Sequence, residues 1–110
     1  MSGRREHTTK LITLYWRDIP AQVMGRRGRK TAFKQALDPR FQRGIDRAAM
    51  RAGRGSSDQY LADWRRESRP CEGDLEQAVS DEVERLESAF PPDVLETVVR
   101  AGGLVNEGEA

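Results

Sequence analysis

The chain has 110 residues, a length typical of one domain, and its 36% hydrophobic and 34% charged residues indicate a modest core beneath a densely charged surface. No apolar run approaches the roughly 20 residues of a membrane-spanning helix, and the first residues contain no apolar stretch suited to export. A single cysteine, Cys71, excludes an internal disulfide framework. We therefore expect a cytoplasmic protein with one domain over residues 10–103 and flexible tails at residues 1–9 and 104–110.

The charge is divided between the two parts of the chain. Residues 1–70 hold 17 Lys and Arg against 7 Asp and Glu, a net of +10, whereas residues 71–110 hold 2 against 11, a net of −9. The acidic part can pack on the basic part, with exposed ion pairs worth at most about 1 kcal/mol each. Alternatively, it is an arm hinged at residues 69–74 that docks on a neighbouring molecule. We favour packing.

The first elements in chain order are strands. Residues 10–19 are rich in β-branched and aromatic residues and predict a strand, which Pro20 breaks. Residues 21–25 predict a short second strand, so that a hairpin turn would include Arg17 to Pro20. Residues 31–37 fit a strand or a helix, and their alternation favours a strand.

Two helices are predicted next. Asp38 can cap the first, and Gly53 supplies its end. Ser56 and Gln59 have the spacing of a capping box and predict a shorter second helix that ends near Glu67. The apolar face of the first helix consists of Phe41, Ile45, Ala48, Ala49 and Ala52.

A linker over residues 68–74 precedes two further helices, which form an acidic helical part over residues 74–103. Asp74 caps the third helix, and Pro92 begins the fourth. Their inward faces are Leu75, Val79, Val83, Leu86 and Phe90 in the third and Val94, Leu95, Val98 and Val99 in the fourth. The predicted fold class is α+β, with a small antiparallel β-hairpin or three-stranded sheet followed by about four amphipathic helices. Both faces of the sheet carry apolar residues, which leaves open which one is buried and whether helices or a partner cover both.

Three segments carry a family resemblance: "ITLYWRDIPAQV" (12–23), "RFQRGIDRAAMRAG" (40–53) and "DQYLADWRR" (58–66). In order and spacing they resemble the bacterial virulence factor domain family over residues 10–67. Members of that family occur as short stand-alone proteins and within longer Gram-positive conserved virulence factor proteins, which also carry an iron–sulfur scaffold-like domain and helical repeats. The stand-alone type accompanies corrinoid and folate one-carbon genes. The resemblance implies an accessory role and supplies no catalytic motif.

The most concentrated positive charge is Arg26, Arg27, Arg29 and Lys30. We favour a solvated turn between strands. The alternative is an anion contact in which glycines at positions 25 and 28 free backbone amides for phosphate, either of nucleic acid or of another ligand, or for an acidic partner. Neither a P-loop nor a dinucleotide-binding fingerprint is present.

The distinctive segment "YWRD" supplies the other candidate contacts. Arg17 and Asp18 are interpreted as a turn in which Asp18 accepts backbone hydrogen bonds, with a ligand-facing ion pair as the alternative. Tyr15, Trp16 and Trp64 are candidate interface aromatics, although at least one of the tryptophans is expected in the core.

No catalytic or metal site is predicted. Cys71 lacks an adjacent base, and the only histidine, His7, lies in the expected tail, so the chain cannot supply the usual zinc ligands either. Glu82, Glu84 and Glu87 are expected on the wet face of a helix. We expect no cofactor and no enzymatic activity.

The favoured function is therefore that of an accessory protein that binds a cytoplasmic enzyme, for which the resemblance indicates corrinoid or folate one-carbon methyl metabolism. The alternative is a small nucleic-acid-binding module that uses the basic loop and the arginines of the first helix. The acidic half, the isoelectric point near 7.9 and the few aromatic residues count against that alternative. The sequence leaves the oligomeric state open.

Overall fold

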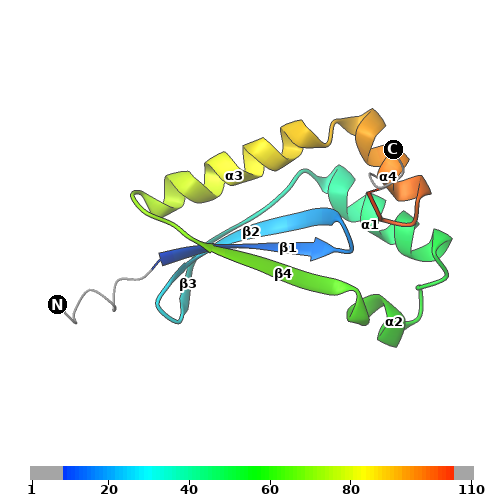
Figure 1. Ribbon diagram of the computed structural model, residues 1–110, viewed down its shortest axis with the longest axis horizontal. Coiled ribbons are helices and arrows are strands. Elements are labelled where there is room, and N and C mark those ends of the chain that lie inside the picture. Colours follow the sequence, from blue (N-terminus) through cyan, green and yellow to red (C-terminus); the bar gives the residue numbers. More distant parts are fainter. Residues whose placement is uncertain (1–8, 106–110) are drawn as a thin grey trace.

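The computed structural model describes residues 9–105 and has the predicted α+β class (Figure 1). The elements are β1 (Thr9–Trp16), β2 (Ile19–Arg27), β3 (Lys30–Ala36), α1 (Pro39–Arg51), α2 (Ser57–Ala62), β4 (Trp64–Pro70), α3 (Leu75–Ala89) and α4 (Pro92–Arg100). The predicted tails at residues 1–8 and 106–110 lie outside the described residues. Thr9, assigned to the first tail, instead begins β1.

The strands form one antiparallel sheet in the order β3-β2-β1-β4. The strand at residues 31–37 is confirmed as β3, whereas β2 is longer than predicted and contains Pro20. Proline is tolerated there because the register shifts between Leu14 and Tyr15, at an irregularity of the ladder. The hairpin turn is accordingly reduced to Arg17 and Asp18.

The prediction of a helix from Ser56 to Glu67 was wrong in its second half. The helix α2 ends at Ala62, and the following residues form β4, the fourth strand, which pairs with β1 and places Trp64 opposite Trp16. Local propensity is a weak determinant, and the long-range backbone pairing with β1 overrides it here. The capping box also fails, because the Ser56 hydroxyl contacts the Gln59 side chain and caps no backbone amide.

The helix α3 packs along one face of the sheet (Figure 1). The acidic part therefore packs on the basic part of the same chain, as we favoured, and is not an extended arm. Asp38 and Asp74 cap α1 and α3 as predicted, accepting hydrogen bonds from the backbone amides of Arg40 and Gln77. The close approach of α3 depends on Gly25 of β2, where a Cβ atom would lie 2.9 Å from carbon atoms of the side chains of α3.

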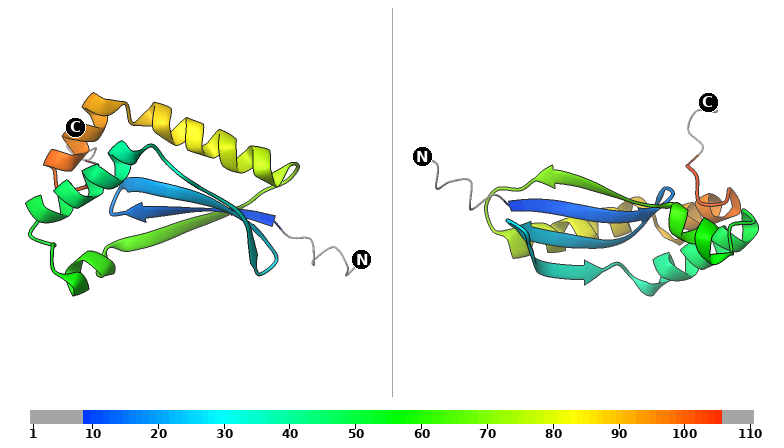
Figure 2. Two further views of the ribbon diagram at one scale, coloured as in Figure 1. Left: turned by 180° about the vertical axis from the view of Figure 1, so that it is seen from behind. Right: turned by 90° about the horizontal axis from the view of Figure 1, so that it is seen from below.

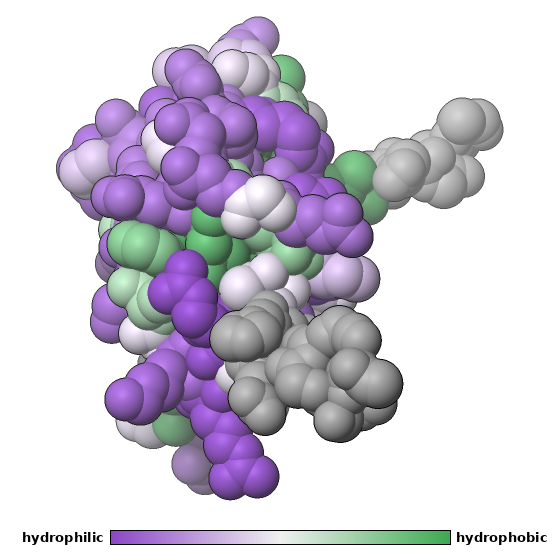
Figure 3. Space-filling model, turned by 90° about the vertical axis from the view of Figure 1, so that its left-hand side faces the viewer, coloured by the Kyte–Doolittle hydropathy of each residue, from purple (hydrophilic) through white to green (hydrophobic). Residues whose placement is uncertain are grey.

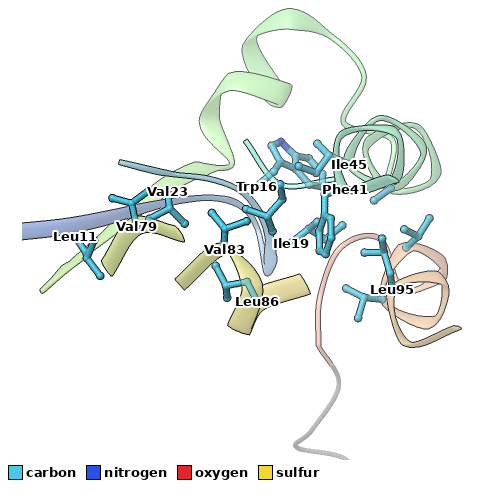
Figure 4. Close-up of a cluster of buried hydrophobic side chains, with 14 of the residues drawn as sticks. Leu11, Trp16, Ile19, Val23, Phe41, Ile45, Val79, Val83, Leu86 and Leu95 are labelled. Carbon is cyan, nitrogen blue, oxygen red and sulfur yellow. The ribbon is translucent and has the colours of Figure 1, made fainter. Parts of the chain in front are cut away.

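The core has two connected parts (Figure 4). In the first, Val79 and Val83 of α3 face Leu11 and Val23 of the sheet. In the second, α1 and α4 close the end of the sheet that carries Trp16, where they contribute Phe41, Ile45, Leu95, Val98 and Val99. Val94, predicted to point inward, is 40% exposed, because α4 buries only the narrower stripe that faces α1.

Candidate interaction surface

None of the helices that the structure describes covers one face of the sheet over most of its length, and we call this face the open face. The helix α3 lies behind the sheet, while α1 and α2 lie at one end of it (Figure 2, right). Cross-strand partners in an antiparallel sheet point to the same side, so the register assigns the residues of this face to three rows. The rows are Ala36–Gln22–Leu14–Arg66, then Lys34–Met24–Ile12–Ser68, then Thr31–Arg26–Lys10–Pro70.

Every charged residue in these three rows is a cation. Lys10, Lys34 and Arg66 are exposed, and Arg26 is half-buried. None of the four forms a salt bridge with a residue that the structure describes, although arginines elsewhere pair with carboxylates. The Nε atom of Arg26 is buried with no hydrogen-bond partner among the described residues, and its Nη2 lies 3.5 Å from the Arg29 carbonyl oxygen. Unpaired donors of one sign create a positive potential that attracts anionic groups.

The predicted cation loop is the tip of the β2–β3 hairpin and extends the positive charge beyond the open face. Arg27, Arg29 and Lys30 are exposed, and Gly28 has the left-handed φ of 64° that this turn requires. Figure 3 views the molecule from this end, where hydrophilic residues surround a small apolar area. Gly25 is no part of a phosphate cradle, because it lies within β2 beneath α3.

A hollow of about 360 Å³ lies at the other end of the open face, between the first row and α1. Leu14 and Ala36 contribute its floor, and Trp64 is half-buried beside it. Ala21, Gln22, Leu37, Pro39 and Gln42 complete its lining. None of its lining residues in the described part of the chain is charged, so the hollow suits an apolar group.

Arg17 and Asp18 form the turn between β1 and β2, and their side chains bind distant parts of the chain. The Arg17 amide donates to the Asp63 carbonyl oxygen at 3.0 Å, and Nη1 of Arg17 donates to the Gly102 carbonyl oxygen at 3.1 Å. The Asp18 carboxylate accepts a hydrogen bond from the Val105 amide at 2.7 Å. We call this group the clasp, because it joins the β1–β2 turn to the start of β4 and to residues 102–105.

Asp63 is the anionic centre of the clasp. Its carboxylate accepts hydrogen bonds from Arg54 at 2.8 Å and from Arg17 at 3.3 Å. The hydrogen bond from Arg54 is the main reason that the pKa of Asp63 is lower than that of an ordinary aspartate, with the charge of Arg17 adding to it. Arg17 itself has a positive φ of 55°, which is uncommon for a residue with a side chain. These bonds hold it in that conformation.

Of the three candidate aromatic residues, Trp64 alone lines the hollow of the open face. Trp16 is completely buried, stacks on Tyr60 with ring centroids 6.0 Å apart, and donates from Nε1 to the Tyr60 carbonyl oxygen. Tyr15 lies on the α3 side of the sheet with the guanidinium of Arg65 4.5 Å from its ring centroid. Burial raises the pKa of Tyr15, so its phenol remains protonated.

Glu82 was expected on a wet face but is buried, with 6% of its surface exposed. Its carboxylate accepts hydrogen bonds from Arg69 of β4 and from Arg85 of α3, which ties the two elements together. The hydrogen bond from Arg85 is the largest cause of a lowered pKa at Glu82. Glu84 is exposed, while the carboxylate of Glu87 accepts the Asp38 amide at 2.8 Å. The Glu82 contacts are those of a structural ion pair.

Within residues 9–105, no group of three His, Cys, Asp or Glu residues could hold a metal ion. Cys71 is half-buried, with its thiol 3.7 Å from the Glu72 carbonyl oxygen, and His7 lies outside the described residues. No helix in the described part of the chain is long and apolar enough to cross a bilayer.

Sequence reasoning missed Lys10, Lys34 and Arg66 as members of one surface. The missing information was β4, whose side chains alternate between Trp64, Arg66 and Ser68 on the open face and their neighbours on the other. That alternation is visible in the sequence but competes with a helical interpretation of the same residues.

Comparison with known proteins gives one family. A family model described as "Virulence factor" matches residues 14–99 of the chain. No curated protein and no solved structure matches it.

Proposed function

We propose that this chain, which belongs to the virulence factor family, is a non-catalytic accessory protein that binds another protein through the open face. The description of the family specifies no chemistry, so the proposal depends on the structure of this face. The observation that carries this proposal is the coincidence of an uncovered sheet face with four cations that have no anionic partner among the described residues. An antiparallel sheet can leave one face in water, so the cations without a described anionic partner, rather than the exposure alone, make this face a candidate surface for a partner.

The charge of the open face indicates the nature of the partner. Lys10, Arg26, Lys34 and Arg66 complement an acidic surface, and complementary charge steers association and selects among partners. The cationic hairpin tip enlarges the attracting field. The protein is proposed to act in the cytoplasm. The genes that accompany the stand-alone type of this family suggest an enzyme of corrinoid or folate one-carbon methyl transfer as the partner.

The test compares two double charge reversals of equal net charge. In Lys34→Glu/Arg66→Glu the open face is changed, and in the control Arg43→Glu/Arg51→Glu exposed cations of α1 are changed. Each tagged variant replaces the native protein at its normal level, and bound proteins are quantified after purification. We expect a stoichiometric partner that is retained by the control and lost from the open-face variant. Equal recovery with both variants, or no stoichiometric partner for the unchanged protein, would refute the proposal.

Nucleic acid is the second candidate, and the same four cations favour it because phosphate contacts require positive charge alone. The three rows contain no aromatic residue, and Trp64 beside them is half-buried and packs on Tyr60, which leaves little ring surface on which bases could stack and counts against single-stranded ligands. Binding to mixed-sequence duplex and single-stranded oligonucleotides at several salt concentrations decides between the two. Tight binding that weakens steeply with salt and disappears in Lys34→Glu/Arg66→Glu would favour nucleic acid.

A further inference from the structure

We infer that the open face recognises an extended peptide segment in which one apolar side chain enters the hollow beside Trp64 and acidic side chains about two to four residues away contact the cations of the second and third rows. This inference rests on the proposed function and specifies the chemistry of the segment bound.

The hollow provides the apolar end of this surface. Its lining consists of aliphatic and aromatic side chains, a proline and two glutamines, and its volume of about 360 Å³ accommodates a side chain the size of leucine or phenylalanine. Trp64 is fixed there by edge-to-face packing on Tyr60, with ring centroids 5.9 Å apart. A hollow with a rigid aromatic wall is the kind of pocket in which a buried anchor residue contributes most of the binding energy.

The cations provide the polar end, and the strand geometry gives the spacing. Leu14 borders the hollow, and Lys10 lies in the third row of the same strand. At 3.3 Å per residue the four steps between them span about 13 Å, a distance that an extended ligand covers in about four residues. Lys34 occupies the intermediate row, and Arg66 flanks the hollow itself. Arg26 is half-buried in the third row beside Lys10 and adds a second positive charge at that end of the surface.

Other occupants fit less well. A second copy that presented the same face would bring like charges together, which costs several kcal/mol at an interface. A wholly apolar helix would fill the hollow but would remove four unpaired cations from water. An acidic segment with an apolar anchor satisfies both ends of the surface.

The test uses three synthetic peptides of equal length. The first has one leucine and a run of glutamates that covers about the second to fourth positions from it. In the second, alanine replaces the leucine, and in the third, glutamines replace the glutamates. Binding to the ¹⁵N-labelled protein is followed by amide chemical shifts. We expect the first peptide to shift amides of the hollow and of the second and third rows together, and the other two to bind about tenfold more weakly.

Protein variants locate the contacts. Ala36→Phe adds a ring at the exposed margin of the hollow, and Ala89→Phe adds the same ring on an exposed site of α3. We expect Ala36→Phe to weaken binding of the first peptide about tenfold and Ala89→Phe to leave it unchanged. The inference is overturned if the alanine peptide binds as well as the leucine peptide, if no peptide binds, or if the shifted amides lie outside the open face. It is also overturned if an oligonucleotide displaces the first peptide at equal concentration.

Failure of this inference is distinguishable from failure of the proposed function. If the partner captured in cells is lost from Lys34→Glu/Arg66→Glu but retained by Ala36→Phe, the open face binds a protein without the apolar anchor. If the partner is retained by Lys34→Glu/Arg66→Glu, the proposed function itself is refuted.

Discussion

Replacement of Gly103 by alanine tests the closure of the clasp. Gly103 follows α4, and its carbonyl oxygen accepts the Asp18 amide at 2.9 Å. Its φ of 93° is a conformation that residues with a side chain rarely adopt. A Cβ atom at this position would also lie 2.8 Å from Cζ3 of Trp16, a ring that is completely buried. The ring cannot move aside, because its Nε1 is bonded to the Tyr60 carbonyl oxygen.

The two effects can be estimated separately. The left-handed backbone conformation costs an alanine about 1–2 kcal/mol relative to glycine. Overpacking a filled core against an immobile ring costs about 1–3 kcal/mol more. Gly103→Ala should therefore lower the free energy of unfolding by about 2–5 kcal/mol, which is a large part of the stability of a small domain.

The control is Gly28→Ala at the hairpin tip. Gly28 also has a positive φ, of 64°, but a Cβ atom there would meet no atom of residues 9–105 within 4 Å. This variant should lose only the backbone contribution of about 1–2 kcal/mol. Urea unfolding of both variants, followed by tryptophan fluorescence, measures the difference. Equal losses in the two variants would show that the contact with Trp16 contributes nothing and would refute the argument.

Two further predictions concern α3 and acid stability. Gly25→Val should destabilise the protein by about 1–3 kcal/mol in urea unfolding, because its Cβ would press on Leu75 and Val79; an unchanged unfolding midpoint would contradict this. Asp63 and Glu82 have lowered pKa values in the folded state, so the stability that they contribute is present above the unfolded carboxyl pKa of about 4 and is lost as the pH falls further. Between pH 5 and pH 3 the melting temperature of Asp63→Asn should fall by less than that of the unchanged protein. If both proteins show the same fall in melting temperature, Asp63 does not contribute to the pH dependence of stability.

The elements predicted correctly from the sequence are those whose signals are local. Asp38 and Asp74 cap α1 and α3 because a short acidic side chain before an apolar periodic run satisfies free backbone amides wherever it occurs. The alternation over residues 31–37 sufficed for β3, and Pro92 begins α4 as predicted.

The failures share a cause in long-range structure. Residues 64–67 have the composition of a helix and become a strand because β1 offers backbone partners more than 45 residues away in sequence. Glu82 is buried because Arg69 of that same strand lies opposite it. The open face could not be recognised without β4, since one of its three rows ends in Arg66 and another in Ser68.

The segment "YWRDIPAQV" resolves into structural and surface contributions. Trp16 is buried in the core, and the side chains of Arg17 and Asp18 form hydrogen bonds of the clasp. These three residues therefore stabilise the fold. Ala21 and Gln22 match no functional motif in the sequence but line the hollow of the open face. In this segment the unusual residues therefore stabilise the fold, and the ordinary residues next to them contribute to the candidate site.

The division of charge along the chain acquires a spatial meaning in the fold. The acidic part packs on the sheet through apolar residues of α3, which directs exposed carboxylates such as Glu76 and Glu84 away from the sheet. The four cations of the open face point in the opposite direction, with the sheet between them and α3. Among the described residues, salt bridges between the basic and the acidic parts of the chain are therefore few, such as Arg47 with Glu96 and Arg69 with Glu82. A net charge of only +1 thus conceals an open face whose charged residues are all cations and which has an apolar hollow at one end.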